Sequence, residues 1–327
     1  MARNLTALGT SGMAVLGLAS LATTRVRARL MAERPAAPSS VPALFPGAPT
    51  QLAPNAAVHA ARRLNRAAGV LAASVLADSA VEHYRGQFYN KAMITPLVTA
   101  SLSLAVSVHG NADNRPVAHH ARDGVYLLAA ATGVVGTGFH LYNVLSKPGG
   151  LTWQNLFYSA PLGAPAALSL SGAMGFLSER VRDTTPGTSP TIAGVAAGRV
   201  VGVATSVGLL GTMGEAGLLH FRGNFQNPFM WTPISLPPVA AAALGLAAIG
   251  RTGQRGGWTR NLLRLTALMG YAGTGFHLRG VARQMGGWRN WSQNILNGPP
   301  VPAPPSFTGL AMAGLAALGL LEDHPDD

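Results

Sequence analysis

Four histidines recur at matched positions and are the side chains best suited to bind a cofactor. His83 lies in "EHYRGQFYNKAMITPL", and His220 lies 137 residues later in "LHFRGNFQNPFMWTPI". His140 and His277 end "GVVGTGFH" and "GYAGTGFH" at the same separation. Imidazole is a common ligand of iron and other transition metals. Each copy could therefore hold one b-type haem through two histidines, border a quinone or bind a metal ion. The alternative is a hydrogen-bonded histidine at a helix end.

Ionisable residues accompany the histidines in both copies. Arg85 and Arg222 each follow a histidine by two positions, where they could neutralise haem propionates or anionic head groups. Asp78 and Glu215 each precede a histidine by five positions and lie inside apolar runs. An acid inside a membrane helix is a candidate for proton or ion handling. The alternative is a static pair with an arginine or another polar group.

The rest of the long repeated phrase is partly a connection between two helices. We expect Gly86 to end the first helix, Thr95 to cap the next and Pro96 to occupy its first position. This skeleton does not explain why an aromatic and an amide recur at fixed offsets. The recurring residues are Phe88, Asn90, Phe225 and Asn227. They predict a folded loop that contacts a ligand or, alternatively, closes the end of the bundle.

Glycines precede the second histidine of each copy at helical spacing. Gly136 and Gly273 lie four residues before His140 and His277, on the same predicted helix face. A smooth glycine surface admits either a flat ring, such as haem or quinone, or the backbone of another helix. We therefore count both glycines as cofactor-binding candidates, with helix packing as the alternative.

The composition is that of a membrane protein and supplies few other chemical groups. Of 327 residues, 48% are hydrophobic and only 11% are charged, against about 25% charged in soluble domains. The chain has no cysteine, which excludes disulfides and thiolate-bound metals. The net charge of +12 is spread over clusters between apolar runs, so we attribute it to membrane topology and expect no nucleic-acid partner. No phosphate loop, nucleophile elbow or zinc signature occurs.

Eight apolar runs predict eight transmembrane helices in the lipid bilayer. They span roughly residues 69–83, 92–108, 124–143, 156–178, 194–219, 231–249, 261–281 and 303–321. Residues 1–24 form a weaker apolar segment, interpreted as an extra helix, a surface-lying segment or a signal-like sequence. Residues 25–60 are rich in proline and alanine and predict a linker.

The repeat predicts the architecture. Residues 61–182 and 183–327 each contain four predicted helices, and an even number returns the chain to its starting side. The fold class is therefore all-α, a polytopic integral membrane protein of two tandem four-helix repeats in parallel orientation. Both pairs of motifs then face the same side of the membrane.

The distribution of basic residues predicts which side this is. From residue 62 onward, the motif-bearing connections carry seven basic residues and the opposite side carries twelve. The positive-inside rule places the twelve in the cytoplasm. We expect a multi-pass protein of the inner cell membrane whose motif-bearing loops lie outside.

These features favour a redox-associated membrane subunit rather than a stand-alone enzyme. It would hold or border a haem b or quinone near the outer face and anchor a peripheral dehydrogenase or c-type cytochrome there. A small-solute transporter or channel built from two parallel repeats is an alternative. A structural anchor without a cofactor is a further one.

Overall fold

The fold is all-α, apart from a two-residue antiparallel strand pair, β1 (Thr191–Ile192) with β2 (Val195–Ala196). A computed structural model describes residues 56–185, 188–250 and 256–323, which belong to one compact unit, Pro54–Asp327. The expected N-terminal segment, residues 1–24, and most of the expected linker lie outside these residues. Because α2 begins at Ala56, the last residues assigned to the linker are helical instead.

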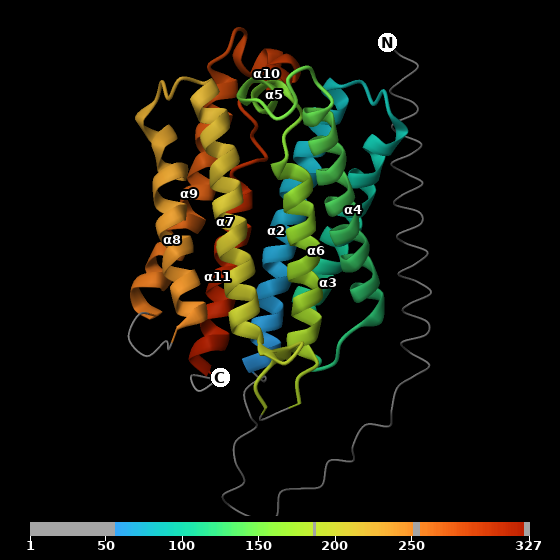
Figure 1. Ribbon diagram of the computed structural model, residues 1–327, viewed down its shortest axis with the longest axis vertical. Helices are drawn as coiled ribbons and strands as arrows, with labels where there is room; N and C mark the ends of the chain where they lie inside the picture. The colour runs from blue at the N-terminus through green and yellow to red at the C-terminus, as the bar shows by residue number, and fades with distance from the viewer. Residues whose placement is uncertain (1–55, 186–187, 251–255, 324–327) are drawn as a thin grey trace, which may run out of the picture. The chain divides into compact units, whose positions relative to one another are not determined.

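Long helices run alternately up and down the unit (Figure 1). Those of the first half are α2 (Ala56–Arg85), α3 (Thr95–Ala112), α4 (His120–Leu145) and α6 (Gly163–Arg182). Those of the second half are α7 (Ala197–Arg222), α8 (Thr232–Ile249), α9 (Gly256–Ala282) and α11 (Pro305–Asp323). Short helices occupy the connections: η1 (Lys91–Ile94), α5 (Trp153–Tyr158), η2 (Pro228–Trp231), η3 (Gly287–Asn290) and α10 (Trp291–Asn297).

Five stretches within the described residues are long and apolar enough to cross a membrane. They are Lys91–Ala112, His120–Leu145, Ala197–Arg222, Pro228–Ile249 and Pro305–Glu322. Hydrophobic side chains such as Leu127, Val134 and Leu268 are exposed on the outside of the bundle. Lipid tails are the solvent that such surfaces require. The structure therefore agrees with an all-α membrane protein.

The helices of each half pack in a matching pattern. In the first half, α6 packs against α2 and α4, and α3 packs against the same two helices. In the second half, α11 packs against α7 and α9, and α8 does likewise. The halves meet where α2 lies against α11 and α6 lies against α7. Consequently α2 and α4, like α7 and α9, are diagonal partners across a four-helix bundle.

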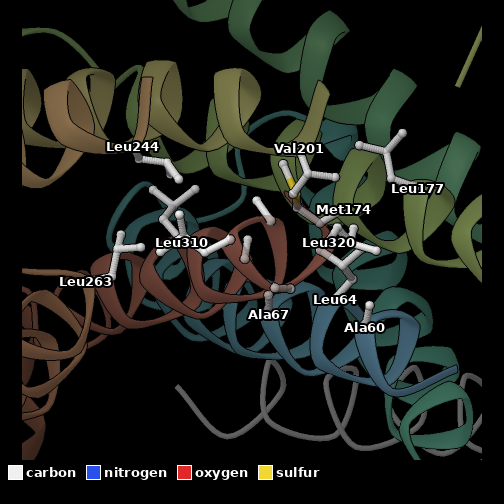
Figure 2. Packing of buried hydrophobic residues seen from close by; sticks show 14 of the residues in the cluster. Ala60, Leu64, Ala67, Met174, Leu177, Val201, Leu244, Leu263, Leu310 and Leu320 are labelled. Carbon is white, nitrogen blue, oxygen red and sulfur yellow. The ribbon is translucent and has the colours of Figure 1, made fainter. Parts of the chain in front are cut away.

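Small and aliphatic residues fill the core between the halves. Figure 2 shows Leu64 of α2, Met174 of α6 and Val201 of α7 near Leu320 of α11, and Leu310 of α11 near Leu244 and Leu263. Close helix approach depends on buried glycine and serine: Ser171 Oγ on α6 donates to the Ala68 carbonyl of α2 over 2.9 Å. Such contacts are typical of helix association in lipid.

Candidate functional site

The repeated phrases lie at one end of the bundle, which we call the motif end. It consists of the connections 86–94, 146–162, 223–231 and 283–304, and Figure 1 shows α5 and α10 there. At this end the chain leaves α2 and α7 by the same turn. Gln87 and Phe88 have positive φ angles of 57° and 47°, and Asn224 and Phe225 have 55° and 45°.

The first helix of each half ends at this glycine as expected, since α2 ends at Arg85 and Gly223 is the C-cap of α7. The glycine is not left-handed, however, and the two residues after it carry the positive φ angles. A Cβ on Gly86 would lie 3.1 Å from Cε of Met93, and one on Gly223 would lie 2.9 Å from Cε of Met230. The glycine therefore makes room for the methionine of the same phrase, which explains why both residues recur.

The asparagines of the phrase have a structural role. Asn90 begins η1, where its side-chain oxygen accepts from the Ala92 N–H over 2.9 Å. Asn227 makes the same contact with the Phe229 N–H over 3.0 Å. Thr95 was expected to be a cap but is the first residue of α3 and makes no capping bond. The capping residue is asparagine instead, because each connection contains a 3-10 helix, η1 or η2, that the sequence pattern did not predict.

All four repeated histidines bind a backbone carbonyl through Nδ1. The acceptors are Met93 for His83 at 2.6 Å, Pro161 for His140 at 2.5 Å, Met230 for His220 at 2.8 Å and Pro300 for His277 at 2.7 Å. A carbonyl only accepts, so each Nδ1 carries the proton. Within the described residues no protein group hydrogen-bonds any of the four Nε2 atoms. Each Nε2 of a neutral ring thus keeps a free lone pair.

The histidines come together in pairs within each half. The rings of His220 on α7 and His277 on α9 have centres 6.4 Å apart and planes inclined by 68°. His83 on α2 and His140 on α4 are near enough to interact electrostatically. In both halves a phenylalanine stands edge-on to the first histidine, with Phe88 6.2 Å from His83 and Phe225 6.3 Å from His220.

The glycines before His140 and His277 face neighbouring helices. A Cβ on Gly136 would lie 3.1 Å from Cβ of Pro165 on α6, and one on Gly273 would lie 2.9 Å from Cβ of Pro304, just before α11. The glycine-bearing faces of α4 and α9 are therefore covered by these prolines at the two positions. Helix packing, the alternative given for the glycine pattern, explains both residues.

The two acids approach one another from different halves. Asp78 on α2 and Glu215 on α7 are both partly buried and interact electrostatically. Glu215 accepts a hydrogen bond from the backbone N–H of Gly163, the first residue of α6. The sequence could not place the two acids together, since they are 137 residues apart and no local pattern connects them.

The two arginines have different surroundings. Arg85 forms an ion pair with Glu82 at 2.9 Å and also donates to the Leu296 carbonyl. The guanidinium of Arg222 lies over the ring of Tyr158, 5.5 Å from its centre. Among the described residues Arg222 has no carboxylate partner, so its charge remains available to an anionic group.

A buried ionic cluster at the opposite end was not predicted from the sequence. Arg122 on α4 is 1% exposed and contacts Glu179 of α6 at 2.7 Å and Asp113 at 2.9 Å. Burial would raise the pKa of the Asp113 carboxyl, but hydrogen bonds from Arg115 and Arg122 outweigh it and hold this pKa well below its usual range. The signal available in the sequence was charged residues at the edges of apolar runs.

Two histidines lie near this ionic cluster. His109 is exposed and His119 is partly buried, and their ring centres lie 5.8 Å apart. His109 Nδ1 lies 3.2 Å from Nη1 of Arg122. Burial, followed by the charge of Arg122, lowers the pKa of His119. In the described part of the chain no group of three or more metal-ligating side chains occurs.

Comparison of the chain with protein-family models, with curated proteins and with solved structures gives no match.

Proposed function

We propose that the protein is an integral inner-membrane subunit that exchanges electrons between the quinone pool and a peripheral redox partner at the motif end. The observation that carries this proposal is the arrangement of the four histidines. The rings of His220 and His277 lie 6.4 Å apart, and His140 influences His83 electrostatically. All four Nδ1 protons are held by carbonyls, so each free Nε2 is available to a redox cofactor. The cofactor is haem b or quinone.

The membrane arrangement belongs to the same proposal. All eight long helices cross the bilayer as two four-helix units in parallel, residues 61–182 and 183–327. The matching helix contacts, turns and histidine tethers of the halves support a duplicated unit. The three helices that are less apolar, α2, α6 and α9, cross the bilayer in contact with the more apolar helices of the bundle. The motif end lies outside, because more basic residues occur at the opposite end.

The chemistry uses the histidine pairs and the two acids together. Written as quinol oxidation, one quinol releases two electrons and two protons and becomes quinone. The histidine pairs would hold one-electron centres, and these would supply electron transfer to two molecules of oxidised c-type cytochrome outside, each of which is reduced by one electron. Asp78 and Glu215 accept the protons and release them to water at the motif end. Arg222 supplies a positive charge for an anionic group of the cofactor or partner.

Quinol oxidation by the purified protein tests this function. The full chain is reconstituted into liposomes with a short-chain quinol, and reduction of an added c-type cytochrome is followed optically. We expect turnover in the wild type and at least a tenfold loss in Asp78→Asn and Glu215→Gln. Glu82→Gln, at an acid that is not repeated in the second half, should retain activity. The proposal would be contradicted if a folded, haem-loaded preparation neither oxidised quinol with the cytochrome nor reduced quinone in the reverse reaction.

The convergence of Asp78 and Glu215 supports a second candidate, a proton-coupled transporter. Paired acids between two parallel units are typical of coupling sites. A pH-sensitive dye trapped in the same liposomes distinguishes the two functions. Proton movement without quinol that depends on both acids would support the transporter, whereas proton release only during quinol oxidation supports electron transfer.

A further inference from the structure

We infer that each histidine pair supplies both axial ligands of a b-type haem, with Nε2 as the bonding atom. The inference rests on the proposed function and identifies its cofactor. The second half shows the required geometry most directly. His220 and His277 reach across the bundle from α7 and α9, which pack mainly against α8 and α11 rather than against each other. Side chains from two diagonal helices project into the bundle interior from opposite sides, so they can bind the two faces of one cofactor.

The separation of the two rings agrees with ligation of one iron atom. Nitrogen–metal bonds of about 2 Å on opposite sides of a metal place the centres of two imidazoles roughly 6 Å apart. The centres of His220 and His277 are 6.4 Å apart. Two side-chain ligands are sufficient for haem because the porphyrin supplies the other four. This fits the lack of any larger group of metal-ligating side chains in the described residues.

The hydrogen bonds favour haem over an ordinary structural role for the histidines. Histidines that bind metals usually donate their other ring N–H to a carbonyl or carboxylate, which fixes the tautomer. His220 donates to Met230 and His277 to Pro300, leaving the lone pair of each Nε2 for iron. Neither nitrogen has to lose a proton when it binds iron. His83 and His140 make the equivalent bonds, so the first half has the same donor set.

A histidine that only closes a loop needs Nδ1, whereas an iron ligand needs Nε2. Asparagine separates the two roles, because its amide nitrogen can replace Nδ1 but provides nothing at Nε2. The test uses H220N, H277N, H83N and H140N in the full chain, purified in detergent from a host supplied with haem precursor. His59→Asn is the control, since His59 is exposed near the start of α2. Haem per chain is measured by the pyridine haemochrome assay and unfolding by a thermal melt.

We expect two b-type haems per wild-type chain and in His59→Asn, and one haem in each of the four variants, with similar melting temperatures for the protein freed of haem. The ferric low-spin EPR signal of the site in the second half should be highly anisotropic, because its imidazole planes are inclined by 68°. If H220N does not fold, His220→Gly with added imidazole provides the second test. Recovery of a low-spin spectrum supports ligation, and no recovery in folded protein contradicts it.

Two results would overturn the inference. One is a folded wild-type protein that takes up no haem even when hemin is supplied, and the other is an asparagine variant that keeps both haems. The outcomes also separate this inference from the proposed function. A haem-free protein that still oxidises quinol retains the function without haem. A haem-loaded protein that exchanges no electrons retains the haem without the function.

Discussion

Glu215 on α7 binds the backbone N–H of Gly163 on α6 and so connects the two halves of the molecule at the level of the paired acids. The contact requires glycine, because a Cβ at position 163 would overlap Oε2 of Glu215. The first N–H groups of a helix have no partner within the helix and attract a carboxylate. Glu215 is thus fixed in place, whereas no hydrogen bond to Asp78 occurs within the described residues.

Gly163→Ala should impair the acid pair without changing either acid. The added methyl group displaces the Glu215 carboxylate, so we expect quinol oxidation to fall about as far as in Glu215→Gln. Gly124→Ala is the matched control, since nothing lies within 4 Å of a Cβ there. Unchanged turnover in folded Gly163→Ala protein would show that the position of Glu215 is unimportant for the reaction.

Substitution of the glycines in "GVVGTGFH" and "GYAGTGFH" should have two different effects on stability. A Cβ on Gly133 or Gly270 would overlap backbone atoms of the neighbouring helix segment, whereas Gly138 and Gly275 have nothing within 4 Å. Alanine at the first two positions should destabilise the protein by about 1–3 kcal/mol or more. Alanine at the other two should be neutral or stabilise by up to about 1 kcal/mol. Thermal melts of the four variants in one detergent test this, and equal effects would contradict the packing.

Removing one partner of the buried ionic cluster should be costly. Glu179→Gln leaves the charge of Arg182 buried without a carboxylate and leaves Arg122 with Asp113 alone, so a loss of about 3–5 kcal/mol is expected. Glu322→Gln is the control, because its pair with Arg260 is partly exposed and should contribute less than about 1 kcal/mol. Chemical unfolding in mixed micelles measures both values. A similar small loss in the two variants would argue against a buried cluster.

Acidification should loosen the end of the bundle that holds this cluster. The pKa of His119 is lowered on folding, so the unfolded chain binds more protons below about pH 6.5 and stability falls there. The lowered pKa of Asp113 adds stability that is present above about pH 4 and is lost as the pH falls further. Melting temperatures between pH 7 and 5 should therefore fall less in His119→Gln than in the wild type. His120→Gln, at the exposed neighbour, should behave as the wild type does.

Single cysteines can establish the orientation, because the natural chain contains none. Tyr89 is 80% exposed at the motif end, and Val117 is 60% exposed at the opposite end. In cells whose outer membrane has been permeabilised and whose inner membrane is intact, a membrane-impermeant maleimide should label Tyr89→Cys and should not label Val117→Cys. After lysis both should react. The reverse pattern would place the motif end in the cytoplasm.

Features that depend on a short stretch of sequence, such as the positions of the helices, could be predicted well. Apolar length placed the helices to within a few residues in most cases, and the 137-residue repeat identified both histidine pairs. The largest differences are at α2, which starts earlier than its apolar run, and at α5, which forms a separate short helix before α6. Alanine and arginine are good helix formers but add little hydropathy, so the run alone did not show where α2 begins.

Contacts between distant segments could not be predicted. The approach of Asp78 to Glu215 and the burial of Arg122 beside Glu179 depend on how helices pack, which a single sequence does not encode locally. The recurrence of a polar amide at fixed offsets is compatible with a ligand contact or with a loop that closes the bundle, and it does not distinguish between them. The role of the asparagines in starting η1 and η2 depends on a 3-10 turn without a hydropathy signal.

The ionic cluster also makes the two halves chemically unequal. Pro165 and Pro304 occupy matching places against Gly136 and Gly273, and the spacing from Pro165 to Pro304 also aligns Glu179 with Leu318, which is 1% exposed. The carboxylate at the centre of the buried cluster therefore has a leucine in its place in the second half, where the ion pair of Arg260 with Glu322 is partly exposed. Protonation of the acids at this end should consequently cost the first half more stability than the second.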